Sequence, residues 1–355
     1  MPKSRIAALA GSLVAIVLTL TACGSSHSDS AAEDPAPAPS GTAAAAGADA
    51  ADLSSVTLRF GQTGWSQAQA ILKVAGLDNT PYQVKWSVFP GGDKQLQALQ
   101  AGALDVASSS DIPPVFAAAA TKPKWKVVAT QRTNTLLQDV VAAKNSGITS
   151  IAQLKGKKVG YVQATTAHYF LYKLLVQSGL DWSDIHAVPL TPQDGVAALS
   201  SGSIDALATY GNSVITTEQQ GARIIGSGQD ILSGNFPYEA SDKLLGDADR
   251  SAALADLLAR LDKGYAFIRD GHEQDYAALM AAAAHEPEAQ ALSQIQADEK
   301  QIPSKVRTVS PDQIAKEQDV ADTFARLGIL PGKVDVASYW TDALTARLTS
   351  ALSGS

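Results

Sequence analysis

Residues 56 to 76 read VTLRFGQTGWSQAQAILKVAG and predict a strand, a loop and a helix in succession. Val56 to Gly61 alternates apolar and polar side chains with the period of a strand. Ser66 to Gln69 fits a capping box, in which two side chains satisfy the first backbone N–H groups of a helix. Gly76 suits the left-handed position that ends a helix. Such a unit is the building block of α/β folds.

Further signals follow at similar spacing. Tyr82 to Phe89 predicts a second strand, Asp93 to Gln100 a helix that stops at Gly102, and Leu104 to Ala107 a third strand. This alternation predicts α/β lobes with mainly parallel sheets. Residues 240 to 350 instead show helical apolar spacing and no strand signal, and we expect these helices to pack on the first lobe and fix its hinge.

A short pattern occurs twice, with a helix end, a glycine and a strand in each copy: Ala98-Leu99, Gly102, Leu104-Asp105 and Ala198-Leu199, Gly202, Ile204-Asp205. It indicates two similar halves, with a chance match as the alternative. In similar halves, residues 108–110 and 209–212 follow equivalent strands. Ligands of open α/β sheets bind beyond the carboxyl ends of strands, so both loops would line one cleft.

The beginning of the chain has the features of an exported lipoprotein. Lys3 and Arg5 precede an apolar run that ends in Leu20-Thr21-Ala22-Cys23, which resembles a bacterial lipobox. We expect residues 1–22 to be a signal peptide and Cys23 to carry lipid after cleavage; an ordinary signal peptide with a chance cysteine is the alternative. Residues 23–54, rich in Ser, Ala, Pro and Gly, predict a disordered tether.

The length, charge and amino-acid composition of the chain limit the classes of function it can have. A chain of 355 residues exceeds what one hydrophobic core usually organises, so two lobes are expected. The net charge of -7, without a basic stripe, argues against a nucleic-acid partner. No Cys/His spacing suits a zinc site, and we expect neither metal nor cofactor. One Cys and two Met fit either a scavenger of sulfur compounds or compositional drift.

Two predicted helix starts are candidate anion sites, because free backbone N–H groups and the positive end of the helix dipole attract negative charge. The first is Ser110 to Phe116, where Ser110 or Asp111 could instead cap its own helix. The second is Gln163 to His168, with Thr166 as the expected cap. His168 has no partner at a catalytic spacing and is expected to be a hydrogen-bonded wall residue.

Several spaced segments resemble the solute-binding proteins of the aliphatic sulfonate, nitrate and taurine ABC transporters, which have a two-lobed type II periplasmic-binding fold. They are residues 110–116, 151–159, 165–169, 190–194 and 319–331. The resemblance implies a first lobe from residues 55–140, a second lobe from 141–232, and a return to the first lobe with additional C-terminal helices over 233–350. Tyr210-Gly211-Asn212 replaces the family's Trp-Asp-Pro-like segment, and Ser109-Ser110 replaces a Gly-containing approach.

The expected function is therefore capture of a small organic anion, first an aliphatic sulfonate, by a monomer lipid-anchored outside the cytoplasmic membrane that delivers it to a permease without catalysis. Nitrate, a thiamine-precursor pyrimidine or another nutrient are alternative ligands, and an enzyme on the same fold is the alternative class. The expected ligand-binding residues are Gly64, Trp65, Ser109, Ser110, Asp111, Leu136, Thr165, Thr166, His168, Tyr210, Gly211, Asn212, Asn235 and Tyr238.

Overall fold

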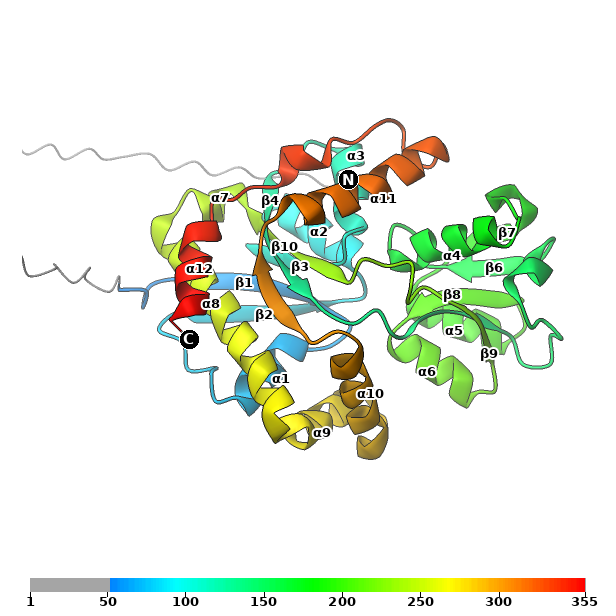
Figure 1. Cartoon of the computed structure of the whole chain (residues 1–355), viewed down its shortest axis with the longest axis horizontal. Coiled ribbons are helices and arrows are strands. Elements are labelled where there is room, and N and C mark those ends of the chain that lie inside the picture. Colours follow the sequence, from blue (N-terminus) through cyan, green and yellow to red (C-terminus); the bar gives the residue numbers. More distant parts are fainter. Residues whose placement is uncertain (1–51, 355) are drawn as a thin grey trace, which may run out of the picture. The chain divides into compact units, whose positions relative to one another are not determined.

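Two β-sheets organise residues 52–354, the part of the chain that the computed structural model describes (Figure 1). The expected signal peptide, Cys23 and nearly all of the expected tether lie outside these residues. None of the helices between residues 52 and 354 is both long and apolar enough to cross a bilayer.

The first sheet has the strand order β11-β4-β10-β3-β1-β2. Its strands are β1 (Thr57–Thr63), β2 (Gln83–Phe89), β3 (Val106–Ser108), β4 (Trp125–Arg132), β10 (Asn235–Ser241) and β11 (Lys305–Thr308). The second sheet has the order β7-β6-β8-β5-β9. Its strands are β5 (Gln138–Ala142), β6 (Lys158–Tyr161), β7 (His186–Pro189), β8 (Ala206–Tyr210) and β9 (Arg223–Ser227).

Both sheets are mixed, so the expectation of mainly parallel sheets is wrong. Pairing is parallel between β1 and its neighbours β2 and β3, and between β6 and its neighbours β7 and β8. The remaining pairs, which involve β4, β5, β9, β10 and β11, are antiparallel. Antiparallel pairing arises because β5, which follows the crossing from β4, and β10, which follows the return from β9, run opposite to the strands beside them, and β11 likewise runs opposite to β4.

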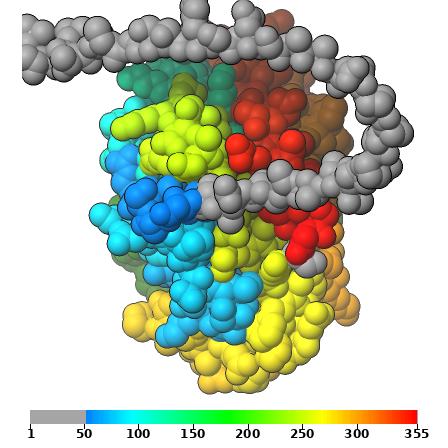
Figure 2. Space-filling model, turned by 90° about the vertical axis from the view of Figure 1, so that its left-hand side faces the viewer, coloured from blue at the N-terminus to red at the C-terminus, as the bar shows by residue number. Residues whose placement is uncertain are grey.

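Helices cover both faces of each sheet. The first lobe, defined as the first sheet with the helices packed on it, has α2 (Gly92–Gln100), α3 (Pro113–Ala120) and α11 (Pro311–Arg326) on one side. On the other side lie α1 (Gln67–Val74), α8 (Ala248–Phe267), α9 (Glu273–Ala284), α10 (Glu288–Gln301) and α12 (Thr345–Ser353), with α7 (Asp242–Leu245) at the end of β10. Figure 2 looks onto this lobe, where red C-terminal residues lie beside yellow α8.

The second lobe is defined in the same way. It has α4 (Thr166–Gln177) on one face of its sheet and α5 (Pro192–Ser200) and α6 (Asn212–Gln219) on the other. Short helical turns complete the two lobes: η1 (Ile151–Leu154), η2 (Trp182–Asp184), η3 (Ile268–His272) and η4 (Val336–Tyr339).

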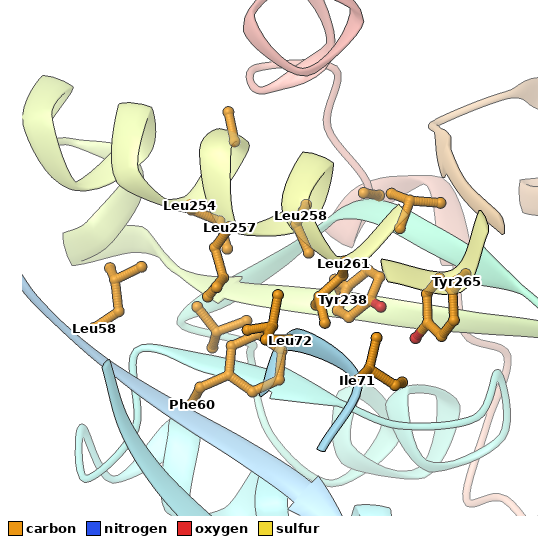
Figure 3. Packing of buried hydrophobic residues seen from close by; sticks show 14 of the residues in the cluster. Leu58, Phe60, Ile71, Leu72, Tyr238, Leu254, Leu257, Leu258, Leu261 and Tyr265 are labelled. Carbon is orange, nitrogen blue, oxygen red and sulfur yellow. The ribbon is translucent and has the colours of Figure 1, made fainter. Parts of the chain in front are cut away.

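The largest core cluster joins α8 to the first sheet. Leu254, Leu257, Leu258 and Leu261 recur at helical spacing and are fully buried. Figure 3 shows this stripe facing Leu58 and Phe60 of β1, together with Ile71 and Leu72 of α1. The expectation that the C-terminal helices pack on the first lobe is confirmed. The expectation that no strand lies in residues 240–350 is wrong, because Lys305–Thr308 pairs with the edge of β4 as β11.

The repeated sequence pattern forms the same structure in both halves. Gly102 and Gly202 end α2 and α5 with φ of 77° and 72°. The Asp105 carboxylate then accepts a hydrogen bond from the Arg59 N–H at 3.0 Å, and the Asp205 carboxylate accepts one from the Lys158 N–H at 2.8 Å. Each aspartate thereby ties the strand after a helix to the central parallel strand of its sheet.

The two interlobe crossings lie side by side and are tied together. The Thr133 N–H donates to the Gly234 carbonyl at 3.0 Å, and the Thr135 hydroxyl donates to the Gln229 carbonyl at 2.9 Å. Gln301 at the end of α10 binds both the N–H and the hydroxyl of Thr135 at 2.9 Å. The C-terminal region therefore braces the hinge, as expected from the sequence.

Candidate functional site: a cleft at the starts of six helices

A cleft of about 430 Å³ is lined by residues of both lobes. This volume lies within the range of pockets that enclose small organic ligands, roughly 300–1,000 Å³. Its walls include apolar residues, among them Trp65, Leu136, Phe236 and Tyr238. Their presence suits the carbon part of a ligand.

The starts of α1, α2, α3, α4, α5 and α6 all contribute lining residues. They are Gln67 and Ala68 (α1), Gly92 (α2), Pro113 (α3), Thr166 (α4), Pro192 and Gln193 (α5), and Asn212 and Ser213 (α6). Because the N-terminal end of a helix carries roughly half a positive charge, this arrangement makes the cleft favourable for an anion.

The scarcity of acidic residues in the first turns of these helices supports this conclusion. The first turns of α1, α3, α4 and α6 contain no acidic residue, so their dipoles remain uncompensated. Only α2 and α5 have an acid there, Asp93 and Asp194. No Lys or Arg of the described chain is among the lining residues, whose polar groups are mainly hydroxyls and amides. Helix dipoles and neutral donors therefore supply the attraction.

The capping box expected at Ser66 is not formed. The Ser66 side chain makes no capping hydrogen bond; instead Oε1 of Gln62 accepts the Ala68 N–H at 2.7 Å. Gln62 is 5% exposed and its Nε2 has no hydrogen-bond partner within residues 52–354. Since Gln62 also lines the cleft, its Nε2 is a free donor there.

The loop after β3 is held rigidly. Gln95 of α2 accepts the Ser108 N–H at 3.0 Å and donates to the Ser108 carbonyl at 2.9 Å. The Ser109 hydroxyl donates to Oε1 of Glu239 at 2.5 Å. A Cβ on Gly92 would stand 2.7 Å from Cβ of Ser109, so glycine is required for this approach. Ser109 and Ser110 both line the cleft, as expected.

Asp111 does not line the cleft and does not cap α3, so neither expected role is supported. Its buried carboxylate accepts a hydrogen bond from the hydroxyl of Ser233, on the returning interlobe crossing. Burial raises the pKa of Asp111 to about 6, against the effect of that hydrogen bond. Asp111 therefore joins the loop after β3 to the returning interlobe crossing.

The start of α4 differs from expectation in its cap. Thr165, not Thr166, is the N-cap, and neither provides a side-chain cap. The Thr165 hydroxyl donates to the Val162 carbonyl at 2.7 Å, and the Thr166 hydroxyl donates to Oε1 of Gln138 at 2.6 Å. Ala164 just before them has φ of 59°, a strained value for a residue with a Cβ. This backbone turn brings Thr165 and Thr166 into the cleft lining.

His168 is a wall residue of the interlobe contact, not part of the cleft lining. Its ring lies 5.8 Å from Phe116 and 5.0 Å from Phe324 in the first lobe, and 4.8 Å from Tyr161 and 5.0 Å from Trp182 in the second. Its Nδ1 accepts the Ala164 N–H at 3.4 Å. Burial lowers the pKa of His168 to about 4, so the ring is neutral at pH 7.

Tyr210 and Gly211 bring the second lobe up to the first. The Tyr210 hydroxyl lies 3.6 Å from the position that a Cβ on Gly91 would occupy, at the start of α2. Gly211 precedes α6 with φ of 58°, a left-handed value that favours glycine. Tyr210 therefore spans the cleft and limits its size.

The cleft brings together most of the expected residues: Gly64, Trp65, Ser109, Ser110, Leu136, Thr165, Thr166, Tyr210, Gly211, Asn212 and Tyr238. Asp111, His168 and Asn235 are not among its lining; Asn235 is buried where β10 begins. Sequence reasoning missed the lining residues Gln138, Gln193, Gln294 and Asp298. Gln193 lies in the segment 190–194 noted from the sequence, whereas α10 has no local signal that places it at the cleft.

No group of three or more His, Cys, Asp or Glu residues between 52 and 354 is arranged to hold a metal ion. The polar groups of the lining can offer a ligand hydrogen bonds and electrostatic attraction.

Comparisons with known proteins agree with this geometry. Residues 85–227 match the family model described as NMT1/THI5 like. An aliphatic sulfonates-binding protein of Escherichia coli (strain K12) is 30% identical over 307 residues, covering 81% of this chain and 90% of that protein.

Solved structures show the same relationship. The periplasmic aliphatic sulphonate binding protein SsuA from Escherichia coli is 29% identical with a TM-score of 0.69, over 80% of this chain and 91% of that one. The alkanesulfonate-binding protein SsuA from Xanthomonas axonopodis pv. citri, bound to MOPS, is 25% identical with a TM-score of 0.72, over 82% and 99%. The chain thus belongs to the family of ABC-transporter substrate-binding proteins that includes these aliphatic sulfonate-binding proteins.

Proposed function

We propose that the protein is the substrate-binding component of an ABC importer and captures an aliphatic sulfonate between its two lobes. The observation that carries this proposal is the convergence of six helix starts on a cleft that also has apolar walls. The family relationship supports it, since the relatives in Escherichia coli and Xanthomonas axonopodis are named for sulfonate or alkanesulfonate binding.

A sulfonate fits the chemistry of the cleft. Its three oxygens share one negative charge and accept several hydrogen bonds, and it stays ionised without any basic side chain. Enclosing that charge is favourable only where fixed dipoles and donors replace water, because an unpaired buried ion is very costly. The hydroxyl of Ser110, Nε2 of Gln62 and the backbone N–H groups at the helix starts supply such donors. Micromolar affinity requires about -8 kcal/mol net.

No bond needs to be made or broken for this function. Relatives at 25–30% identity are binding proteins, whereas the desulfurization enzyme DszB is similar at 16% identity and shares the fold alone. Delivery to a permease, export of the chain and anchoring through lipid on Cys23 complete the proposal. The periplasmic relative from Escherichia coli supports export.

A ligand panel tests the proposal. Purified protein is titrated calorimetrically with ethanesulfonate, butane-1-sulfonate, sulfate, nitrate and an aminopyrimidine. We expect micromolar binding of the sulfonates and a rise in thermal stability, about 2.7 kcal/mol when a ligand reaches 100 times its Kd. Binding of nitrate or the pyrimidine without the sulfonates would overturn the proposed substrate, and conversion of a bound sulfonate into product would overturn the non-enzymatic role.

A further inference from the structure

The cleft extends well beyond the helix starts, onto the α8 side of the first sheet. There its lining consists of Trp65, Leu261, Tyr265, Met280, Ala283, Gln294 and Asp298, which we call the distal pocket. These residues come from the loop before α1 and from α8, α9 and α10, which Figure 1 shows together on one side of the first sheet. Because both sets of residues line one cleft, this pocket is available to the organic tail of a sulfonate held at the helix starts.

The distal pocket contains a carboxylate without a counter-charge. Within residues 52–354, Asp298 forms no side-chain hydrogen bond and no ion pair, although it is half-buried. Burial raises the pKa of Asp298 to about 7, and the neighbouring Glu299 acts in the same direction. Glu299 is itself paired with Arg269 at 3.3 Å.

A second acceptor lies one helical turn away. Gln294 and Asp298 are four residues apart on α10 and therefore share a face of that helix. Nε2 of Gln294 donates to Oε2 of Glu286 at 3.0 Å, which orients the amide and leaves its Oε1 free. That Oε1 is buried and has no hydrogen-bond partner in the described part of the chain.

Aromatic rings also line the distal pocket. The rings of Trp65 and Tyr276 lie 5.9 Å apart, and Trp65 lines the pocket together with Tyr265. Burial raises the pKa of Tyr276, and the negative charge of Asp298 acts in the same direction. Faces of aromatic rings attract cations, so the rings and the two acceptors favour the same kind of ligand group.

We propose that the distal pocket binds a protonated amine, so that the preferred substrate is an aminoalkanesulfonate whose two ends carry opposite charges. This inference rests on the proposed function, because it assumes that the sulfonate occupies the helix starts. An ammonium group would donate to the Asp298 carboxylate and to Oε1 of Gln294, which satisfies both acceptors. Asp298 is then a specificity-determining residue.

The test compares two ligands of equal size, 3-aminopropane-1-sulfonate and butane-1-sulfonate, which differ by an ammonium in place of a methyl group. Calorimetric Kd values are measured at pH 8 for the wild-type protein and for Asp298→Asn. We expect the wild type to favour the amine by about tenfold or more, as for other charge-assisted pairs shielded from water. Asp298→Asn should lose that preference while keeping its affinity for butane-1-sulfonate.

Glu288→Gln, at the opposite end of α10, removes the same charge outside the cleft lining and should keep the wild-type preference. Thermal unfolding establishes that each variant is folded. Equal or tighter wild-type binding of butane-1-sulfonate, or an unchanged preference in Asp298→Asn, would overturn the amine pocket alone. Failure of the wild type to bind either ligand would overturn the proposed sulfonate function and this inference with it.

Discussion

Ser109 lines the ligand cleft, and its hydroxyl donates to Oε1 of Glu239 at 2.5 Å. Glu239 is completely buried between β3 and β4, and its Oε2 has no hydrogen-bond partner within residues 52–354. Burial raises the pKa of Glu239 well above its usual value, despite the hydrogen bond from Ser109. An uncharged Glu239 holds Ser109 in place without repelling an anion.

Glu239→Gln should flatten the pH dependence of stability. With its pKa raised in the folded state, Glu239 holds a proton that the unfolded chain releases above about pH 4.3. Folding stability from this group therefore falls as pH rises above that value, by up to about 1.4 kcal/mol per pH unit. Thermal unfolding between pH 5 and 8 measures the slope of folding stability against pH. The exposed Glu218→Gln is the control, and an equal slope in wild type and Glu239→Gln would contradict the burial effect.

His168→Phe should change the pH dependence of folding stability in the direction opposite to that of Glu239→Gln. The folded pKa of about 4 lies below the unfolded value of about 6.5, so the unfolded chain binds more protons between these values. Stability from neutral His168 is present above pH 6.5 and is lost toward pH 4, by roughly 3 kcal/mol. Phe keeps a ring among its aromatic neighbours and removes this loss. Unfolding curves at pH 4.5 and 7 measure it, and identical acid sensitivity would refute the assignment.

Thr166→Ala should weaken sulfonate binding by about ten- to a hundredfold, the usual scale for a hydrogen bond to a charged group. Thr166 lines the cleft at the start of α4, and its hydroxyl, which donates to Oε1 of Gln138, must turn away from Gln138 to donate to the sulfonate. Thr166→Ser keeps the hydroxyl and should bind within a few-fold of the wild type. Calorimetric titration with butane-1-sulfonate separates the cases; equal loss in both variants would show that the methyl group matters and the hydroxyl does not.

Gly92→Ala should disturb the loop after β3, which contains Ser109. The added Cβ would lie 2.7 Å from Cβ of Ser109 and 3.0 Å from Cγ of Pro113, and overpacking of this kind costs about 1–3 kcal/mol. We expect lower thermal stability and weaker sulfonate binding together. Gly332→Ala, where nothing lies within 4 Å of the new atom, is the matched control. Unchanged affinity in folded Gly92→Ala would mean that the position of Ser109 does not limit binding.

Structural features that depend on residues close together in the sequence could be predicted from the sequence. The alternation of Val56 to Gly61 and the leucine stripe of α8 fixed the strand and helix types, because burial of one face imposes a period on the chain. The glycines at positions 76, 102 and 202 predicted helix ends, because their positive φ favours a residue without a Cβ. The convergence of Ser109 and Tyr210 on one cleft followed from the repeated pattern.

Only the tertiary structure decided what the side chains touch across long separations. Thr166 reaches Gln138 instead of capping its helix, Asp111 meets Ser233 at the hinge, and His168 packs between the lobes. The edge strand β11 has too few apolar residues for a pattern and exists because β4 offers it a pairing partner. Asp298 joins the cleft only because α10 folds back onto α9, which packs against α1. A sequence records local periods and turns, whereas such contacts depend on how whole elements pack.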